Sequence, residues 1–211
     1  YVAGAGCTGA TQYDSTGKLT ALQNQAFLQV SYHYDGAGRL IDRILSNGAK
    51  TRYQYDDDNR LIQLINSSAN STEVENLNYQ HDEVGNITQI SNSTTNKTTD
   101  YQYDASYRLT NVDSSDNTED RSYSYDKVGN RKTESKNGST YYYCYHPTDC
   151  NQNPQGNRLY NIRTNSLTGT LYRQFSYDNA GRLLQKQDGT GNLIYQVNYN
   201  SKGRANSIST A

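Results

Sequence analysis

A short phrase that recurs along the chain constrains the fold more than any other feature. It reads Tyr-Asp, two or three variable residues, then Gly-Arg-Leu, and it stands in full at residues 34–40 and again at residues 177–183. A fixed period near 20 residues is typical of repeat proteins, in which one small unit is stacked many times. The Tyr-Asp-like pairs of eight copies begin at Tyr13, Tyr34, Tyr55, His81, Tyr103, Tyr125, Tyr177 and Tyr199.

The wide gap between Tyr125 and Tyr177 predicts a ninth, degenerate copy that carries an insertion. The segment 143–146 fits its first half and 156–159 its second half. The repeats then cover nearly all of the chain. The residues assigned to structural positions of the repeat are Tyr34, Asp35, Gly38, Arg39, Leu40, Tyr55, Asp56, Arg60, Leu61, Tyr103, Asp104, Arg108, Leu109, Tyr125, Asp126, Gly129, Tyr177, Asp178, Gly181, Arg182 and Leu183.

Each copy is predicted to be a β-hairpin. Aromatic residues two apart, such as Tyr53 and Tyr55, lie on one face of a strand. The Asp side chain starts a turn by accepting a backbone hydrogen bond two residues on, and the Gly then takes a positive φ. Asn59 stands in the Gly position once and tolerates that backbone, whereas Tyr107 in the same position predicts a different turn geometry or a shifted register.

The far end of each hairpin carries a second turn. Asn47-Gly48 and Asn137-Gly138 indicate two-residue hairpin loops. Nine units of two strands predict an all-β fold of about 18 antiparallel strands in one continuous, curled or spiralling sheet. We expect an extended N-terminal arm over residues 1–10, a repeat domain over 11–211 and an insertion near 144–156.

Composition explains how such a sheet holds together. The chain has 211 residues, a net charge of −1, 21 tyrosines and a mean hydropathy of −1.00. Because aliphatic residues are scarce and tyrosine carries a large apolar ring, we expect a thin Tyr-rich sheet in place of an aliphatic core. The balanced charge gives no basic field for nucleic acid, and we expect no membrane insertion. The chain begins at Tyr1 and has no Met, which predicts a processed product or an excised segment.

Three cysteines and six glycosylation sequons are candidate modification sites. Cys144 and Cys150 flank a short loop, which predicts a local disulfide, although with His146 and Asp149 the same cysteines could hold a metal. Cys7 is left over, either free or cross-linked to another copy. The sequons lie at Asn66, Asn70, Asn86, Asn92, Asn96 and Asn137, where polar turn residues are the plainer interpretation.

The repeated Tyr-x-Tyr-Asp-x-x-Gly-Arg-Leu phrase resembles the YD-repeat, or RHS-repeat, family. That family includes the shells of bacterial toxin complexes, polymorphic RHS toxins and the extracellular barrel of teneurins. The resemblance implies hairpins joined into a strip that spirals around a hollow, and a non-catalytic scaffold that is exported or extracellular. Family shells use many more repeats, and because we see neither a self-cleaving core segment nor a toxin domain among these residues, we expect repeats without cargo.

The recurrence of one Tyr-Asp pair argues against an enzyme, because a general base depends on one tuned site. We expect no catalytic residue, no metal and no cofactor. The recurring arginines are expected to pair with Asp or to stack on tyrosines of adjacent repeats, with a ligand-binding ladder as the alternative. They are Arg39, Arg60, Arg108, Arg158, Arg182 and Arg204.

Three functions are compatible with these features. We find no capping unit at either end of the repeats, which predicts a self-assembling extracellular filament or tube whose partners are further copies, head to tail. The first alternative is a fragment of a larger RHS shell that encloses a toxin or forms an adhesion ectodomain. The second is a glycan-binding module, in which the tyrosines at positions 141–143 and 145 stack on cell-surface sugars.

Overall fold

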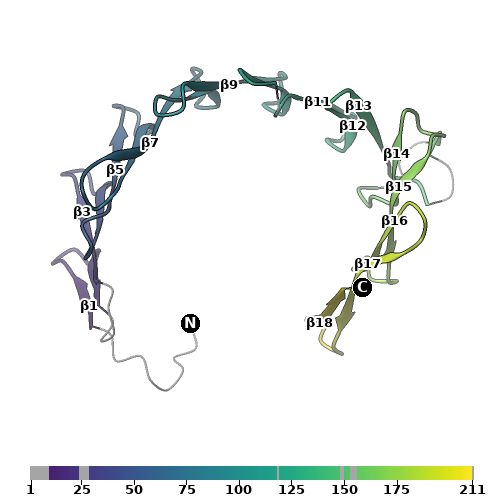
Figure 1. Ribbon diagram of the computed structural model, residues 1–211. Coiled ribbons are helices and arrows are strands. Elements are labelled where there is room, and N and C mark those ends of the chain that lie inside the picture. Colours follow the sequence, from purple (N-terminus) through teal and green to yellow (C-terminus); the bar gives the residue numbers. More distant parts are fainter. Residues whose placement is uncertain (1–9, 24–28, 118, 148–149, 153–155, 211) are drawn as a thin grey trace. The chain divides into compact units, whose positions relative to one another are not determined.

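The computed structural model describes residues 10–23, 29–117, 119–147, 150–152 and 156–210, and these residues form an all-β protein (Figure 1). Eighteen strands belong to one antiparallel sheet, as the repeat count predicts. The chain divides into two compact units. The first extends to Tyr101 and takes in Ser114–Asp116, and the second is Gln102–Asp113 together with the chain from Asn117 onward.

In the first unit, each strand pairs with the next strand along the chain, from β1 to β9. Most are five to seven residues long, which is the usual length of a strand. The strands are β1 (Ala10–Tyr13), β2 (Leu19–Gln23), β3 (Gln29–Tyr34), β4 (Leu40–Leu45), β5 (Lys50–Tyr55), β6 (Leu61–Ser67), β7 (Glu73–His81), β8 (Ile87–Asn92) and β9 (Lys97–Tyr103), the last of which ends just inside the second unit.

The second unit continues the same meander, again with each strand paired to its successor. The predicted insertion lies between β13 and β14. The strands are β10 (Leu109–Ser114), β11 (Arg121–Tyr125), β12 (Arg131–Lys136), β13 (Ser139–Cys144), β14 (Asn161–Thr164), β15 (Leu171–Tyr177), β16 (Leu183–Asp188), β17 (Leu193–Tyr199) and β18 (Ala205–Thr210).

Successive residues of β5, β6 and β7 point to opposite faces of the sheet. In the first unit, Tyr53 lies opposite Leu64, and Leu64 lies opposite Leu77, so these side chains share one face. The other face carries Gln63 opposite Asn78, and the Gln63 side-chain amide donates to Asn78 Oδ1 at 3.0 Å. At these positions the alternation places apolar and amide side chains on opposite faces, while Ile65, opposite Asn76, lies on the face of Gln63.

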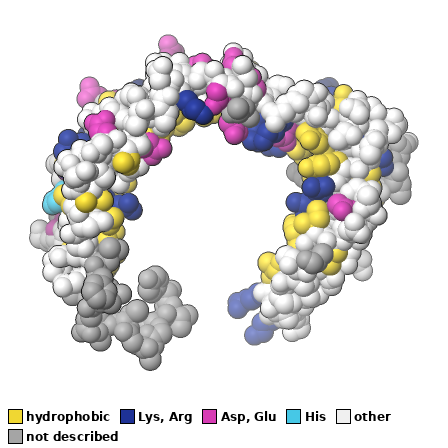
Figure 2. Space-filling model, viewed as in Figure 1, with side chains coloured by type: hydrophobic (Ala, Val, Ile, Leu, Met, Phe, Trp, Pro, Cys, Tyr) yellow, Lys and Arg dark blue, Asp and Glu magenta, His cyan; other side chains and the backbone are white. Residues whose placement is uncertain are grey.

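The sheet is a single layer. Among the described residues, Ala21, Cys144 and Val197 are the buried hydrophobic side chains, and most other strand residues are half-buried. Figure 2 shows hydrophobic side chains visible along the strands of both units rather than enclosed beneath a second layer. Stability must therefore come from contacts along the sheet, between neighbouring strands and neighbouring repeats.

Two predictions about turns are wrong. Tyr107 adopts a φ of 58° and fits the ordinary turn, in which its N–H donates to the Asp104 carbonyl at 2.9 Å. The left-handed backbone costs a non-Gly residue roughly 1–2 kcal/mol, which the hydrogen bonds of the turn offset. At Asn47-Gly48 the loop is longer than two residues, because the Leu45 N–H donates to the Ala49 carbonyl at 2.8 Å. Asn137-Gly138 does form the two-residue loop, since both residues have a positive φ and Lys136 pairs with Ser139.

The N-terminal arm was predicted over residues 1–10. Residues 1–9 lie outside the described part of the chain, and Ala10 already belongs to β1. Cys7 lies outside it too. The described residues include no long apolar helix of the kind that crosses a membrane.

Candidate functional site: the joint between successive repeats

The turn that follows each repeat Tyr is organised by the Asp carboxylate. At Asp56, Oδ1 accepts the N–H groups of Asp58 at 3.0 Å and Arg60 at 2.8 Å, and Oδ2 accepts the Arg60 Nε–H at 2.7 Å. The backbone hydrogen bond from Arg60 lowers the pKa of Asp56, with the Arg60 side chain acting in the same direction. The same set of bonds recurs at Asp35, Asp104 and Asp178, where the pKa is also lowered.

The arginine that closes one turn also reaches the next repeat. Arg39 Nη1 donates to the Asp56 carbonyl at 3.0 Å, and its guanidinium lies 5.0 Å from the centre of the Tyr55 ring. Arg108 has the same geometry in a later repeat. It donates to the Asp126 carbonyl at 3.0 Å, and its guanidinium lies 4.7 Å from the centre of the Tyr125 ring. Both predicted roles of the arginines, pairing with Asp and stacking on a neighbouring Tyr, are thus filled by a single side chain.

The repeat Tyr completes the contact in the opposite direction. Tyr55 donates its hydroxyl hydrogen to the Leu40 carbonyl of the preceding repeat at 2.9 Å. A β-bulge beside the repeat Tyr shifts the pairing of the two strands of its hairpin by one residue. Between β5 and β6, this shift places Tyr55 opposite Leu61. Equivalent bonds at 2.7–3.0 Å join Tyr34 to Leu19, Tyr125 to Leu109, Tyr177 to Leu159 and Tyr199 to Leu183.

We call this set of contacts the inter-repeat joint: the cation that closes one turn, the carbonyl of the following Leu, and the Tyr and turn backbone of the next repeat. The next repeat's glycine belongs to it. Gly181 has a φ of 81°, and a Cβ added there would collide with the guanidinium of Arg158. Gly203 stands in the same relation to Arg182, so glycine serves both the backbone and the approach of the cation.

Two repeats replace the arginine by asparagine. Asn86 Nδ2 donates to Asp82 Oδ2 at 2.8 Å, and Asn130 Nδ2 donates to Asp126 Oδ2 at the same distance. The shorter side chain therefore satisfies the carboxylate of its own turn as Arg does. Its amide is too short to extend to the next repeat, so the two tasks of the arginine are separable.

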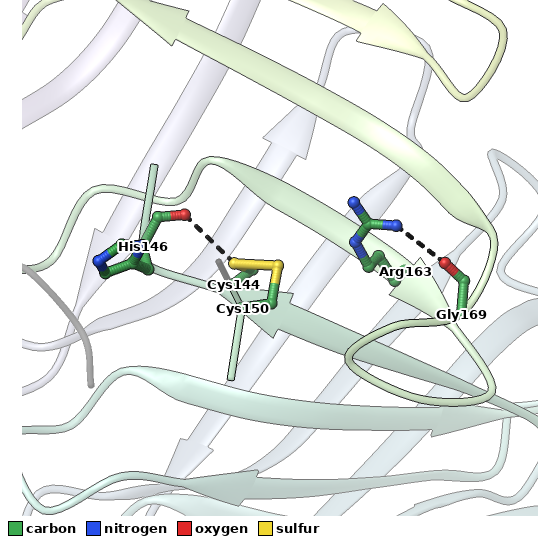
Figure 3. Close-up of a disulfide and its surroundings, with 5 residues drawn as sticks. All are labelled: Cys144, His146, Cys150, Arg163 and Gly169. Carbon is green, nitrogen blue, oxygen red and sulfur yellow. Dashed lines mark hydrogen bonds between the residues drawn. A yellow bond between two sulfur atoms is a disulfide. The ribbon is translucent and has the colours of Figure 1, made fainter. Parts of the chain in front are cut away.

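The insertion replaces the Asp turn by a covalent link. A disulfide joins Cys144 to Cys150, with their Cα atoms 5.0 Å apart (Figure 3). Cys144 is fully buried, and its Sγ lies 3.3 Å from the His146 carbonyl oxygen. With both sulfurs in this bond, neither is a thiolate ligand for a metal, and Asp149 lies outside the described residues.

A polar network beside the insertion was not foreseen from the sequence. Tyr143 donates to Glu134 Oε2 at 2.6 Å, and Arg131 Nη1 donates to the same oxygen at 3.1 Å. Burial raises the pKa of Tyr143 to about 12, and the hydrogen bond to Glu134 adds to this. Arg131 stands where most other repeats have Leu, and that departure from the repeat is the signal that could have found the network.

The sequons occupy two kinds of position. Asn66 lies within β6 and donates its Nδ2 to Glu75 at 2.8 Å, while Asn86 is the turn asparagine described above. In both, the nitrogen that would carry a glycan already has a partner. The other four lie at or beside turns, and their glycosylation stays a prediction: Asn70, Asn92, Asn96 and Asn137.

A known protein family matches part of the repeat region. The family model described as RHS Repeat matches residues 34–71, which hold one full inter-repeat joint between Arg39 and Tyr55. Residues 34–71 are an RHS repeat. No curated protein matches the chain.

Two solved structures share the fold over nearly the whole chain. The structure titled as a Tc holotoxin pore of Photorhabdus luminescens with a TccC3 mutation superposes on 96% of this chain with a TM-score of 0.64 and 19% identity. A TcdB2-TccC3-Cdc42 structure superposes on 93% with a TM-score of 0.63 and 19% identity. This chain spans 12% of the length of each of those chains.

Proposed function

We propose that this chain is a stretch of RHS shell wall, a non-catalytic scaffold that works outside the cell. The observation that carries the proposal is the recurrence of one inter-repeat joint through both units. In the regular copies the Asp organises the turn of its own repeat, while the Arg and the Tyr bind the neighbouring repeat. Repeated structural contacts of this kind are what a wall needs, whereas a catalytic site depends on one tuned group.

The superposition on Tc toxin chains supports the same function. Those chains are far longer, and the part that resembles this chain is a strip of the same antiparallel hairpins. The Cys144–Cys150 disulfide supports a location outside the reducing cytosol, where such bonds persist. The filament expected from the sequence gains no support from either comparison.

Electron microscopy of the native protein at near-neutral pH, without reducing agent, tests the proposal. We expect discrete particles or short curved strips whose wall is one sheet thick. Ordered filaments with a regular axial repeat would overturn the shell function and restore the head-to-tail filament. A parallel sample treated with reductant serves as the control, because the joints themselves contain no disulfide.

A further inference from the structure

The insertion between β13 and β14 does more than interrupt a repeat, because it walls off a cavity on one face of the second unit. The cavity has a volume of about 560 Å³, within the range of roughly 300–1,000 Å³ that is usual for small-molecule sites. Its floor is the strand surface of β11, β12 and β13, where Ser124 lies opposite Thr133 and Thr133 lies opposite Tyr142.

Both walls of the cavity are fastened to the sheet (Figure 3). One wall is formed by Cys150, Asn151 and Gln152, and the disulfide holds it to Cys144 in β13. The other contains Leu167 from the loop between β14 and β15. That loop is held by Arg163, whose Nη1 donates to the Gly169 carbonyl at 2.9 Å. The cavity is therefore shaped by fixed contacts.

The lining combines tyrosine rings with cations. Lys127 and Lys132 are exposed at the cavity and form no ion pair within the described part of the chain. One carboxylate, that of Asp126, also lines it, but its Oδ1 accepts the N–H groups of Val128 at 3.0 Å and Asn130 at 2.8 Å. The Asp126 charge is directed into its own turn, so the two ammonium groups dominate the field in the cavity.

From this lining we infer a binding site for a carboxylated sugar, either free or at the end of a glycan. A pyranose ring presents C–H groups on one face, which pack on an aromatic ring such as that of Tyr142, and hydroxyl groups around its edge. The hydroxyls of Ser124 and Thr133 on the floor are hydrogen-bonded to each other at 2.6 Å, and their remaining lone pairs accept hydrogen bonds from that edge. A carboxylate on the sugar pairs with Lys127 and Lys132. The site lies wholly in the second unit, and the inference does not rest on the proposed shell.

The test uses isothermal titration calorimetry of the intact chain with two probes, 3′-sialyllactose and its uncharged core, lactose. We expect sialyllactose to bind about five- to tenfold more tightly, which corresponds to about 1.0–1.4 kcal/mol, because exposed ion pairs each contribute little. The double variant Lys127→Gln with Lys132→Gln should lower sialyllactose affinity to that of lactose. Lys202→Gln, which removes a lysine elsewhere in the same unit, should leave both affinities unchanged.

Two further variants separate stacking and wall geometry from charge. Tyr142→Leu keeps a strand-compatible apolar side chain and should weaken the binding of both sugars equally. Cys150→Ser frees the wall and should weaken both, while circular dichroism shows that the sheet persists. Equal affinities for the two probes, binding that survives the lysine and tyrosine changes, or no binding at about 5 mM would each overturn the site.

Discussion

The regular repeats and the inserted repeat solve the same problem with different residues. In a regular repeat such as that of Asp104, a carboxylate organises the turn and Arg108 links it to the next repeat. In the inserted repeat, His146 stands in the Asp position and a disulfide closes the loop. Yet the Tyr177 hydroxyl still donates to the Leu159 carbonyl at 2.8 Å, and Arg158 still lies over Gly181.

What survives the insertion is the joint, and what is replaced is the turn. Tyr145 shows the same on the other side, because its hydroxyl is hydrogen-bonded to the backbone of Arg131 in the preceding repeat. The contacts between repeats therefore define this fold more strictly than the Tyr-Asp turn that makes the repeat visible in the sequence. The following substitutions test whether the contacts between repeats contribute more to stability than the turns do.

Removing a joint tyrosine should have the largest effect. Tyr177→Ala loses the bond to Leu159, the edge-on contact with Tyr160 at 5.7 Å and the packing of a half-buried ring. We expect a loss of about 2–3 kcal/mol in the free energy of unfolding, measured by urea denaturation. Tyr177→Phe is the matched control, because it removes the hydroxyl alone and should cost about 1 kcal/mol. Equal losses in the two variants would show that the ring contributes nothing to the joint.

Opening the inserted turn should cost less than breaking a joint. The disulfide closes a loop with a sequence separation of 6, for which chain entropy gives about 2 kcal/mol. Cys150→Ser should therefore lower stability by about that amount and raise hydrogen exchange in the insertion, with joint amides on both sides still protected. Exchange that spreads into β15 and β16 would show that the turn, and not the joint, holds the inserted repeat.

Shortening a joint arginine should have a smaller effect. Arg108→Asn reproduces the natural turns at Asn86 and Asn130, which keep the carboxylate satisfied. It loses the bond to the Asp126 carbonyl and the stack on Tyr125, for an expected cost of about 1 kcal/mol. The stability of Arg108→Lys should lie between those of Arg108→Asn and the unmodified chain. Lysine can keep the contact with the ring, as Lys18 does at 5.5 Å from the centre of the Tyr34 ring. Thermal unfolding of both variants against the unmodified chain measures the difference.

Acid should weaken the turns that an Asp carboxylate organises, including the turn at Asp188 between β16 and β17, while the inserted turn keeps its covalent link. The hydrogen bond from the Thr190 hydroxyl, with further backbone and Asn192 bonds, lowers the pKa of Asp188 to about 2. A carboxyl whose folded pKa is lowered stabilises the fold above its ordinary pKa near 3.8, and this stabilisation is lost as the pH falls toward the folded value. We expect the unfolding midpoint to be steady above about pH 5 and to decline between about pH 4 and pH 2.

The control for this titration exists in the chain itself. Asn200 accepts the N–H groups of Lys202 and Arg204 through its Oδ1 at 3.0 Å, and it carries no charge. Asp188→Asn should therefore keep its turn and flatten the pH dependence. An unchanged acid slope in that variant would exclude Asp188 as a contributor.

The sequence predicts this fold well because the repeat is local. Strand pairs, the positive φ at Gly38 and the two-residue loop at Asn137-Gly138 follow from residues close together in the chain. It predicts less well where the hydrogen bonds of a turn override the preference of a single residue. Tyr107 adopts the left-handed backbone because hydrogen bonds from Asp104 and Arg108 hold the turn. The conformational preference of tyrosine alone does not predict this.

The inter-repeat contacts were harder to derive. That the Tyr hydroxyl binds a Leu carbonyl 15 to 18 residues earlier depends on the stagger at each bulge. The roles of Lys18 and Arg131 were hidden because each departs from the repeated phrase. The cavity in the second unit depends on how the insertion folds back, which spacing alone does not specify.

A double-mutant cycle between adjacent repeats tests the central claim most directly. The cycle combines Arg108→Asn with Tyr125→Leu, which share one joint, and is compared with a cycle of Arg108→Asn and Tyr199→Leu, which do not. We predict a coupling of about 0.5–1 kcal/mol in the first cycle and additivity within roughly 0.3 kcal/mol in the second. Additivity in both cycles would contradict the account, because it would mean that the repeats are held by backbone pairing alone.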